Sequence, residues 1–261
     1  GTELARAQGF DLNRFDPTTG KAKVYRHDPN DPASLSHNRV RHITPAPGGI
    51  LWIGTNGGLN RFDKNAETFT HWEHDPGNAD SLSNNRVTPI LLDPSGALWV
   101  GSDAGLNRFE PRTGRFQRVT MANGLANDGI QGMLQDKDGN LWCSTFRGLF
   151  RYSPGSGEVR NYSDRDGLAG LEFWMNAYAQ GTNGEMFFGG TNGLTASFPS
   201  RIRPNPHAPP VVLTGLAIRN KPYAANPATV SSLALGHEDN VLELSFAALD
   251  FADPPRNLFS H

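Results

Sequence analysis

The 261-residue sequence contains a single cysteine, Cys143, which excludes an intrachain disulfide and a thiol-rich metal cluster. It also lacks any apolar run close to the roughly 20 residues that cross a bilayer as a helix. Charge of one sign is not in excess, because the formal net charge is −2. Proteins that bind phosphates usually show a clustered basic excess, so nothing here indicates binding to nucleic acid or to an anionic membrane.

Residues that form turns are abundant instead. The chain has 29 Gly and 19 Pro, and 10% of its residues are aromatic. Many turns joining short, aromatic-rich strands produce this composition. No segment of useful length keeps a 3.6-residue apolar period, which excludes a solenoid of helices.

Sequence markers repeat in register along the first 200 residues. Gly-Leu-Asn-Arg-Phe occupies residues 58–62 and 105–109, and Asp-Leu-Asn-Arg-Phe occupies residues 11–15, at equal intervals of 47 residues. A fixed period of this size indicates a repeat architecture. The other copies and markers lie at residues 34–40 and 81–87 (Ser-Leu-Ser-x-Asn-Arg-Val), at 51–55, 98–102, 141–145 and 186–190 (the Leu-Trp type), and at 148–152 and 193–198.

Each repeat is predicted to form four short strands, because apolar runs alternate with Pro- and Gly-containing turns. Four strands in just over 40 residues match one blade of a β-propeller. We therefore predict an all-β fold, a β-propeller fragment of about 4.5 four-stranded blades. Gly1-Thr2 aligns with Gly54-Thr55, so a half blade comes first and Glu3–Phe10 is expected to form a loop. The full blades are expected at about residues 40–75, 87–121, 130–162 and 173–198.

The combined pattern Asn-x-Val, Asp-x-x-Gly-x-Leu-Trp-Ile/Val-Gly-Thr/Ser and Gly-Leu-Asn-Arg-Phe resembles the two-component regulator propeller repeat. This resemblance assigns residues 1–199 to propeller blades. Residues 200–210 are proline-dense and are expected to form an extended linker. Residues 211–261, with strands expected at Val211–Ile218 and Val241–Phe246, resemble the start of the immunoglobulin-like triple-tyrosine domain of this family. The resemblance implies a membrane span and a histidine kinase or diguanylate cyclase outside this chain.

Several chemically suggestive residues have plainer structural explanations. Trp52, Trp99 and Trp142 lie in central strands, so packing between blades is favoured over stacking on sugars. The aspartates of residues 136–140 suit a turn better than a calcium loop, because the glutamate of such a loop is absent. Cys143 replaces a glycine of the repeat and is predicted to be a small buried residue.

The sequence indicates no catalytic residues, no metal site and no cofactor. Its eight histidines do not show metal-binding spacing, and His27 and His74 hold equivalent repeat positions, which favours a role in turns. No nucleophile elbow, phosphate loop or dinucleotide fingerprint occurs. We therefore expect a chain that is not itself an enzyme.

Departures from the repeat indicate where a ligand would bind. The loop that leads into the first strand of a blade and the loop between its second and third strands open on the same face. On that face Phe146-Arg147 replaces the usual Asn-Gly, and residues 171–176 replace the usual Ser-x-Asn-x-Val. An aromatic ring and an arginine beside amides suit an oligosaccharide or a carboxylated ligand, although packing against the immunoglobulin-like domain is an equal alternative. The candidate ligand-binding residues are Asn56, Asp103, Phe146, Arg147, Trp174 and Asn176.

The resemblance implies a ligand-sensing domain in the periplasm, bound to the membrane only through regions outside this chain. Its expected partners are an oligosaccharide or another small molecule, and a second copy paired through the immunoglobulin-like domain. Nucleic acid is not expected. Two other classes stay open: a scaffold for protein interactions and, less favoured, a propeller polysaccharide lyase or glycosidase, which needs a cluster of acids and bases at the central channel.

Overall fold

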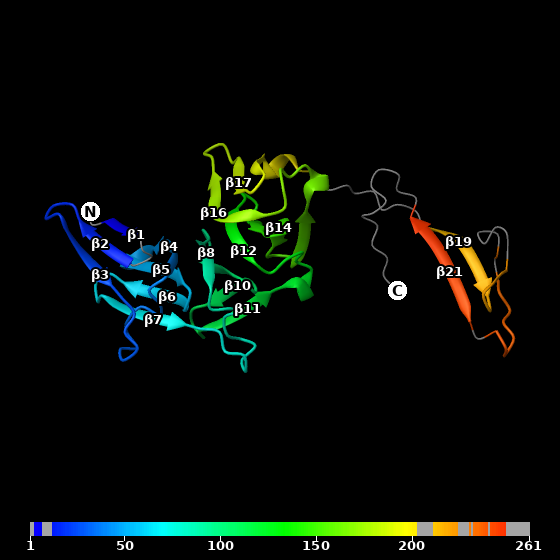
Figure 1. The fold of residues 1–261 in the computed structure, drawn as a ribbon, viewed down its shortest axis with the longest axis horizontal. Coiled ribbons are helices and arrows are strands. Elements are labelled where there is room, and N and C mark those ends of the chain that lie inside the picture. Colours follow the sequence, from blue (N-terminus) through cyan, green and yellow to red (C-terminus); the bar gives the residue numbers. More distant parts are fainter. Residues whose placement is uncertain are drawn as a thin grey trace. The chain divides into compact units, whose positions relative to one another are not determined.

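A computed structural model describes residues 3–6, 12–202, 211–223, 230, 232–239 and 241–248. The chain divides into two compact units, residues 1–202 and 203–261. The described residues form antiparallel sheets with only short 3-10 turns between strands, so the predicted all-β propeller is confirmed for the first unit (Figure 1).

Five sheets, here called blades I to V, make up the described part of the first unit. Blade I contains β1 (Glu3–Arg6), β2 (Leu12–Asp16) and β3 (Lys21–Tyr25). Blade II contains β4 (Val40–Ala46), β5 (Ile50–Thr55), β6 (Gly58–Asp63) and β7 (Thr68–Trp72). Blade III contains β8 (Val87–Leu92), β9 (Leu98–Ser102), β10 (Gly105–Glu110) and β11 (Arg115–Val119). Blade IV contains β12 (Ile130–Gln135), β13 (Leu141–Thr145), β14 (Gly148–Ser153) and β15 (Glu158–Tyr162). Blade V contains β16 (Phe173–Gln180), β17 (Met186–Gly190) and β18 (Gly193–Ser197). The 3-10 turns are η1 (Pro47–Gly49), η2 (Met121–Asn123), η3 (Asp164–Asp166) and η4 (Pro199–Arg201).

The first strands of successive blades lie next to one another, β4 beside β8, β8 beside β12, and β12 beside β16. Threonine hydroxyls tie these strands together across the blade boundaries. Thr44 Oγ1 donates to the carbonyl oxygen of Ile90 at 2.8 Å, and Thr88 Oγ1 donates to that of Ile130 at 2.6 Å. The first strands of blades II, III and IV are therefore hydrogen-bonded to one another across the blade boundaries.

The prediction of a loop over Glu3–Phe10 is wrong for its first part, because Glu3–Arg6 form β1. β1 pairs with β2 so that Arg6 lies opposite Leu12, as Gly54 lies opposite Leu59 in blade II. The strand is thus five residues later in the chain than the Gly-Thr alignment suggested. Backbone pairing with β2 outweighs the two-residue motif, because it satisfies the hydrogen-bonding groups of the chain.

The prediction of a full blade at 173–198 is also wrong, since blade V has three described strands rather than four. β18 ends at Ser197, and Pro199 then opens the turn η4. Proline has no backbone N–H, so it cannot extend an antiparallel ladder.

Tryptophans fill the space between neighbouring blades, as predicted. Trp52 and Trp99 are 7% and 2% exposed. The Trp52 ring lies 5.4 Å from that of Phe109 in the next blade, and the Trp99 ring lies 5.7 Å from that of Tyr152. Trp142, 2% exposed, belongs to the cluster between blades IV and V. These rings are therefore core residues.

An acidic side chain links blade I to blade II. Glu67, in the turn between β6 and β7, accepts a hydrogen bond from Lys23 Nζ, from Arg14 (3.1 Å) and from the hydroxyl of Tyr25 (3.1 Å). Its backbone is left-handed, with φ of 55°, where Gly114 has φ of 70° in the equivalent turn of blade III. A glutamate rarely adopts this conformation, so the three bonds outweigh local strain.

The link makes the stability of the chain depend on pH. Hydrogen bonds, first from Lys23 and then from Tyr25, lower the pKa of Glu67 below its ordinary value of 4.5. An acid whose pKa is lowered by folding stabilises the fold above its unfolded-state pKa and loses that effect as pH falls through its folded-state pKa. We expect the melting temperatures of the wild type and Glu67→Gln to converge as pH falls below 4.5, measured by circular dichroism. A gap that stays constant from neutral to acid pH would contradict this expectation.

The second unit has its own sheet, in the order β20-β19-β21. Its strands are β19 (Val211–Ile218), β20 (Lys221–Pro222) and β21 (Leu242–Ala248). Both strands predicted here are present, β19 with the predicted bounds. Residues 203–210, most of the predicted linker, and residues 249–261 lie outside the described residues. The assignment to an immunoglobulin-like domain stays a prediction.

Candidate functional site

The loops between second and third strands are bonded to the segment that leads into the next blade. These loops and lead-in segments together form what we call the loop face. The glycine that opens each third strand supplies the bond. Gly58 has φ of 113°, and a Cβ there would lie 2.3 Å from the carbonyl oxygen of Trp72, so only glycine fits. The bonds join Gly58 to Asn85 (2.7 Å), Gly105 to Asp128 (2.8 Å) and Gly148 to Leu171 (2.7 Å).

The repeated asparagine supports the lead-in segments of blades II and III through hydrogen bonds. Asn107 is fully buried, and its Oδ1 accepts the backbone N–H of Ser83 at 3.0 Å. Its Nδ2 donates to Ser83 Oγ (2.8 Å) and to the carbonyl oxygen of Val100 (3.1 Å). Asn60 makes the corresponding bonds to Ser36 in blade II. The asparagine repeated at the same spacing thus holds this part of the loop face in place.

Blades IV and V satisfy the same backbone amide with other side chains. Phe150 holds the place of Asn107 in blade IV, and Asn161, directly opposite it on β15, accepts the N–H of Ala126 at 3.1 Å. In blade V the hydroxyl of Thr195 accepts the equivalent amide at 3.2 Å. The same backbone N–H of the lead-in segment is therefore hydrogen-bonded in blades III, IV and V, but a different side chain accepts it in each.

Two predicted site residues, Asn56 and Asn176, meet at Arg41. Arg41 Nε donates to Asn56 Oδ1 at 2.8 Å, and Asn176 Nδ2 donates to the carbonyl oxygen of Arg41 at 3.0 Å. Asn176 Oδ1 also lies 3.3 Å from His42 Nδ1. The polar groups come from β4, from the loop after β5 and from β16, so blades II and V are in contact here.

A cavity of about 350 Å³ lies at this contact, lined by Arg41, His42, Ile43, Asn176 and Tyr178. Small-molecule sites commonly have about 300–1,000 Å³ and a few convergent polar groups. Burial raises the pKa of Tyr178 to about 12, so its phenol is protonated at neutral pH. The cavity therefore offers a guanidinium, an imidazole, an amide and a phenol to a polar ligand.

Asn176 lies on a strained piece of backbone. Its φ is 60°, and β16 has an irregularity in its pairing with β17 between Phe173 and Tyr178. Asparagine tolerates the left-handed region better than most residues, but the conformation still has a cost. Strain of this kind gathers at functional sites, where surrounding contacts hold it. The bonds to Arg41 and His42 are those contacts.

Asp103 lies in the equivalent loop of blade III and forms an ion pair with Arg86, with 2.7 Å between Asp103 Oδ2 and the arginine NH1. Among the described residues, Asp103 Oδ1 and Arg86 Nε are buried without a hydrogen-bond partner. Ordered water or a ligand is the usual partner of such atoms. The structure thus joins Asp103 to a residue of its own blade.

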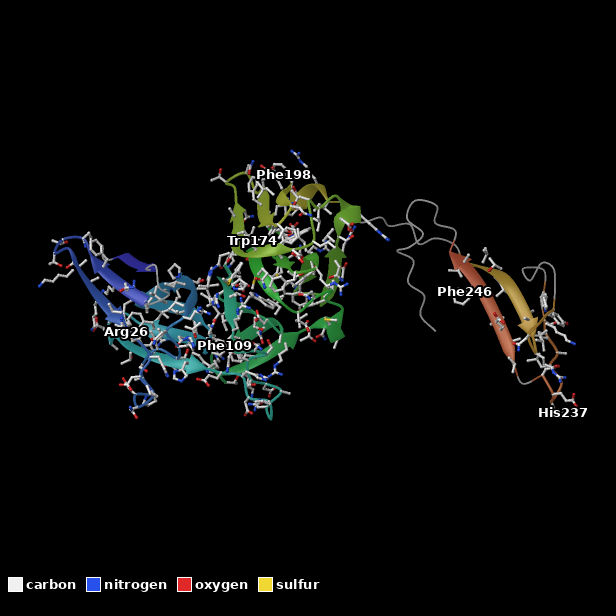
Figure 2. The ribbon with its side chains drawn as sticks, viewed as in Figure 1. Arg26, Phe109, Trp174, Phe198, His237 and Phe246 are labelled. Carbon is white, nitrogen blue, oxygen red and sulfur yellow. The ribbon has the colours of Figure 1, made fainter. Side chains whose placement is uncertain are left out.

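The other three predicted residues are exposed. Phe146 is 47% exposed, and its ring lies against Gly129, where a Cβ would come within 3.0 Å of it. Arg147 is exposed, and its backbone N–H donates to Thr145 Oγ1. Trp174 is 62% exposed on β16, two residues before Asn176 (Figure 2). The six residues therefore fall into a cavity group, an ion pair and an exposed group.

Sequence reasoning missed Arg41, His42 and Tyr178. Arg41 and His42 depart from the repeat, because blade III has Thr88-Pro89 at the same strand positions. This departure is a signal that could have identified them. The contact with β16 carried no such signal, since it joins residues 134 apart in the chain.

The residues given structural explanations behave as predicted. Asp136 accepts bonds from the backbone N–H groups of Asp138 and Asn140 and from Trp142 Nε1, which is turn chemistry. His74 bonds through Nδ1 to the carbonyl oxygen of Leu82 at 2.7 Å. Cys143 is fully buried, which raises the pKa of its thiol far above the ordinary range.

The described residues form neither a cluster of metal ligands nor an apolar helix long enough for a membrane span. No three His, Cys, Asp or Glu side chains among them gather closely enough to hold a metal ion. No helix formed by these residues has the length and apolar character needed to span a bilayer.

The blades place the first unit among β-propellers. The whole chain is similar to the extracellular domain of the hybrid two-component system BT3049 from B. thetaiotaomicron, at 25% identity with a TM-score of 0.67, over 94% of this chain and 35% of that one. It also matches the extracellular domain of the one-component system BT4673 from B. thetaiotaomicron, at 20% identity and a TM-score of 0.55, over 85% of this chain and 34% of that one. The chain thus spans about a third of the length of these structures.

The sequence identifies the kind of blade. The two-component regulator propeller model matches residues 34–57, 81–104 and 124–147, each running from a lead-in segment to the loop after the second strand. Three segments of the first unit therefore match the two-component regulator propeller repeat. No curated protein matches the sequence. Virginiamycin B lyase from Staphylococcus aureus shares the fold at 16% identity and a TM-score of 0.51, over 80% of this chain and 71% of that one.

Proposed function

We propose that this chain is part of the periplasmic, ligand-sensing region of a two-component or diguanylate cyclase receptor and is not itself catalytic. The three matched repeats and the similarity to the extracellular domain of a hybrid two-component system support this role. The likeness to a lyase concerns the fold alone, because identity is 16%. Function depends on the site rather than on the fold.

The cavity between β4 and β16 is the observation that carries the proposal. Arg41, His42, Asn176 and Tyr178 converge on about 350 Å³. Such groups bond to the hydroxyls of an oligosaccharide or to another small polar molecule. Trp174 adds an exposed ring two residues from Asn176, and rings of this kind stack on the apolar faces of sugars.

Signal transmission follows from binding that differs between two states. A ligand shifts an equilibrium only by its difference in affinity for the two conformations. Asn176 joins blades II and V, so a ligand that competes for its amide changes that contact. The second unit, proposed to begin an immunoglobulin-like domain that pairs with another copy, would pass the change to the regions beyond this chain.

A thermal-shift screen with neutral and acidic oligosaccharides tests the proposal. A ligand at about 100 times its Kd stabilises a protein by about 2.7 kcal/mol, which raises the Tm of a domain of this size by roughly 5–10 °C. We expect Asn176→Gly to lose most of this shift while keeping the fold, because glycine adopts a φ of 60° freely. Trp174→Ala and Arg147→Ala are expected to reduce it.

Two results would redirect the assignment. A flat screen on a folded chain, with another protein captured through Phe146 and Trp174, would favour a scaffold, since both side chains are exposed. Turnover of any oligosaccharide would show a propeller enzyme instead.

A further inference from the structure

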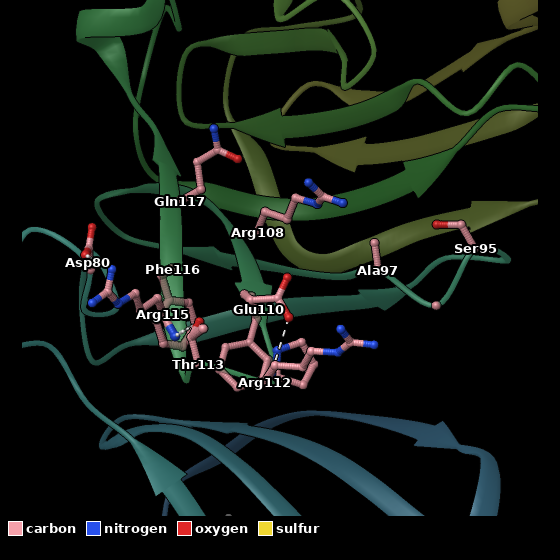
Figure 3. Close-up of a pocket in the computed structure, with 13 residues that line it drawn as sticks. Asp80, Ser95, Ala97, Arg108, Glu110, Arg112, Thr113, Arg115, Phe116 and Gln117 are labelled. Atoms are coloured by element: carbon pink, nitrogen blue, oxygen red, sulfur yellow. Dashed lines mark hydrogen bonds and ion pairs between the residues drawn. The ribbon is translucent and has the colours of Figure 1, made fainter.

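Two blades carry the same groove at their outer edge. In blade III it has a volume of about 690 Å³ and is lined by strands β10 and β11 and the turn between them (Figure 3). In blade I it has a volume of about 390 Å³. The repeat places Arg108 where blade I has Arg14, and Arg115 where blade I has Lys21. The two grooves therefore share two basic positions, whereas Lys23 and Tyr25 of blade I are replaced by Gln117 and Val119 in blade III.

The groove of blade I is occupied by a carboxylate from the protein itself. Glu67 of the next blade lines it and bonds to Arg14, Lys23 and Tyr25. Charge-assisted bonds of this kind are about twice as strong as neutral ones. The groove of blade I is thus a carboxylate-binding site, and the carboxylate that it binds is Glu67 of the same chain.

The corresponding carboxylate is missing at blade III. Gly157 of blade IV holds the turn position of Glu67, with φ of 75°, and a Cβ built there has no atom within 4 Å. Arg108 lies over the ring of Trp99, at 5.9 Å from its centroid, and the ion pairs formed by the described residues near it, Arg115–Asp80 and Arg151–Glu158, do not include it. The larger volume of this groove fits the absence of a side chain from blade IV.

The two acids of the blade III groove already have partners. Asp80 lies 3.4 Å from Arg115, and Glu110 Oε1 accepts the backbone N–H of Arg112 at 3.3 Å. Figure 3 shows the Arg108 side chain apart from both acids. The guanidinium of Arg108 therefore remains to bind an anion from outside the protein.

We propose that the groove of blade III binds the carboxylate of a small acidic oligosaccharide through Arg108, as Arg14 binds Glu67. Arginine pairs with carboxylates in a bidentate fork. Thr113 and Gln117 line the same groove and offer a hydroxyl and an amide to the hydroxyl groups of the sugar. The site is separate from the cavity at Asn176 and does not depend on the function proposed for it.

Titration calorimetry of the whole chain with trigalacturonate at low ionic strength tests the inference. We expect saturable binding that the fully methyl-esterified trisaccharide does not show. Arg108→Gln should raise Kd by about tenfold or more. Arg61→Gln is the matched control, because Arg61 holds the same motif position in blade II, where a Cβ built at Gly114, the turn residue of the next blade, would lie 3.1 Å from Trp72 Nε1. That variant should bind as the wild type does.

A second variant supplies the missing carboxylate from within. Gly157→Glu copies Glu67, and we expect it to prevent trigalacturonate binding while the protein melts as a folded chain. The inference is overturned if the wild type does not bind, if the ester binds equally well, or if Arg108→Gln or a folded Gly157→Glu binds within about twofold of the wild type. Asn176→Gly should leave this binding unchanged, so the two sites succeed or fail separately.

Discussion

Replacing Trp142 by alanine should lower the free energy of unfolding of the first unit by about 3–5 kcal/mol. The ring is 2% exposed and stacks on Tyr162 with 5.2 Å between ring centroids. Its Nε1 donates to Asp136 Oδ2 at 2.8 Å, so the change opens a cavity and also removes a bond from the turn. A loss of this size is a large share of the stability of a typical domain.

Trp174→Ala is the matched control, because it is the same substitution at a ring that is 62% exposed. It should change the free energy of unfolding by no more than about 0.5 kcal/mol. Urea unfolding followed by far-ultraviolet circular dichroism measures both variants. Equal losses would mean that Trp174 is a core residue, and a small loss for Trp142→Ala would remove the packing role from the repeated tryptophan.

Asn107→Ala should cost about 2–4 kcal/mol, because it leaves the buried N–H of Ser83 without its acceptor and the carbonyl of Val100 without its donor. The amide is fully buried, so water cannot replace those bonds without opening the blade. Ser83 Oγ keeps its 2.7 Å bond to Ser102, which limits the loss.

Asn30→Ala is the control for this change, since Asn30 lies exposed in the lead-in to blade II. It should stay within about 0.5 kcal/mol of the wild type. The same urea series measures both. Were Asn107→Ala as mild as Asn30→Ala, the repeated asparagine would have to be explained by something other than its bonds.

The fold could be predicted from the sequence because the same strand and turn signals recur in successive blades. Turn residues such as Pro94 and Gly96, and a buried tryptophan such as Trp99, recur at fixed intervals, so each copy supports the others. Local signals were weakest at the first and last strands. There the backbone pairing of Glu3–Arg6 and the proline at 199 decided the outcome.

The candidate site was predicted only in part. Asn56 and Asn176 were named from departures in the repeat, but their meeting at Arg41 depends on how the blades curve, which no local pattern encodes. Glu67 was missed because a single acidic residue in a turn looks like solvent-facing charge. Its role depends on Arg14 and Lys23, which lie 53 and 44 residues away in the chain.

The exchange of Phe150 and Asn161 in blade IV has a consequence for how such repeats diverge. Losing the asparagine of β14 first would leave the N–H of Ala126 without a protein acceptor, whereas gaining Asn161 first adds a spare acceptor across the ladder. The second order never passes through an unsatisfied intermediate. A repeated residue of the motif can therefore be replaced with this bond kept throughout, provided that a side chain on the neighbouring strand accepts the N–H first.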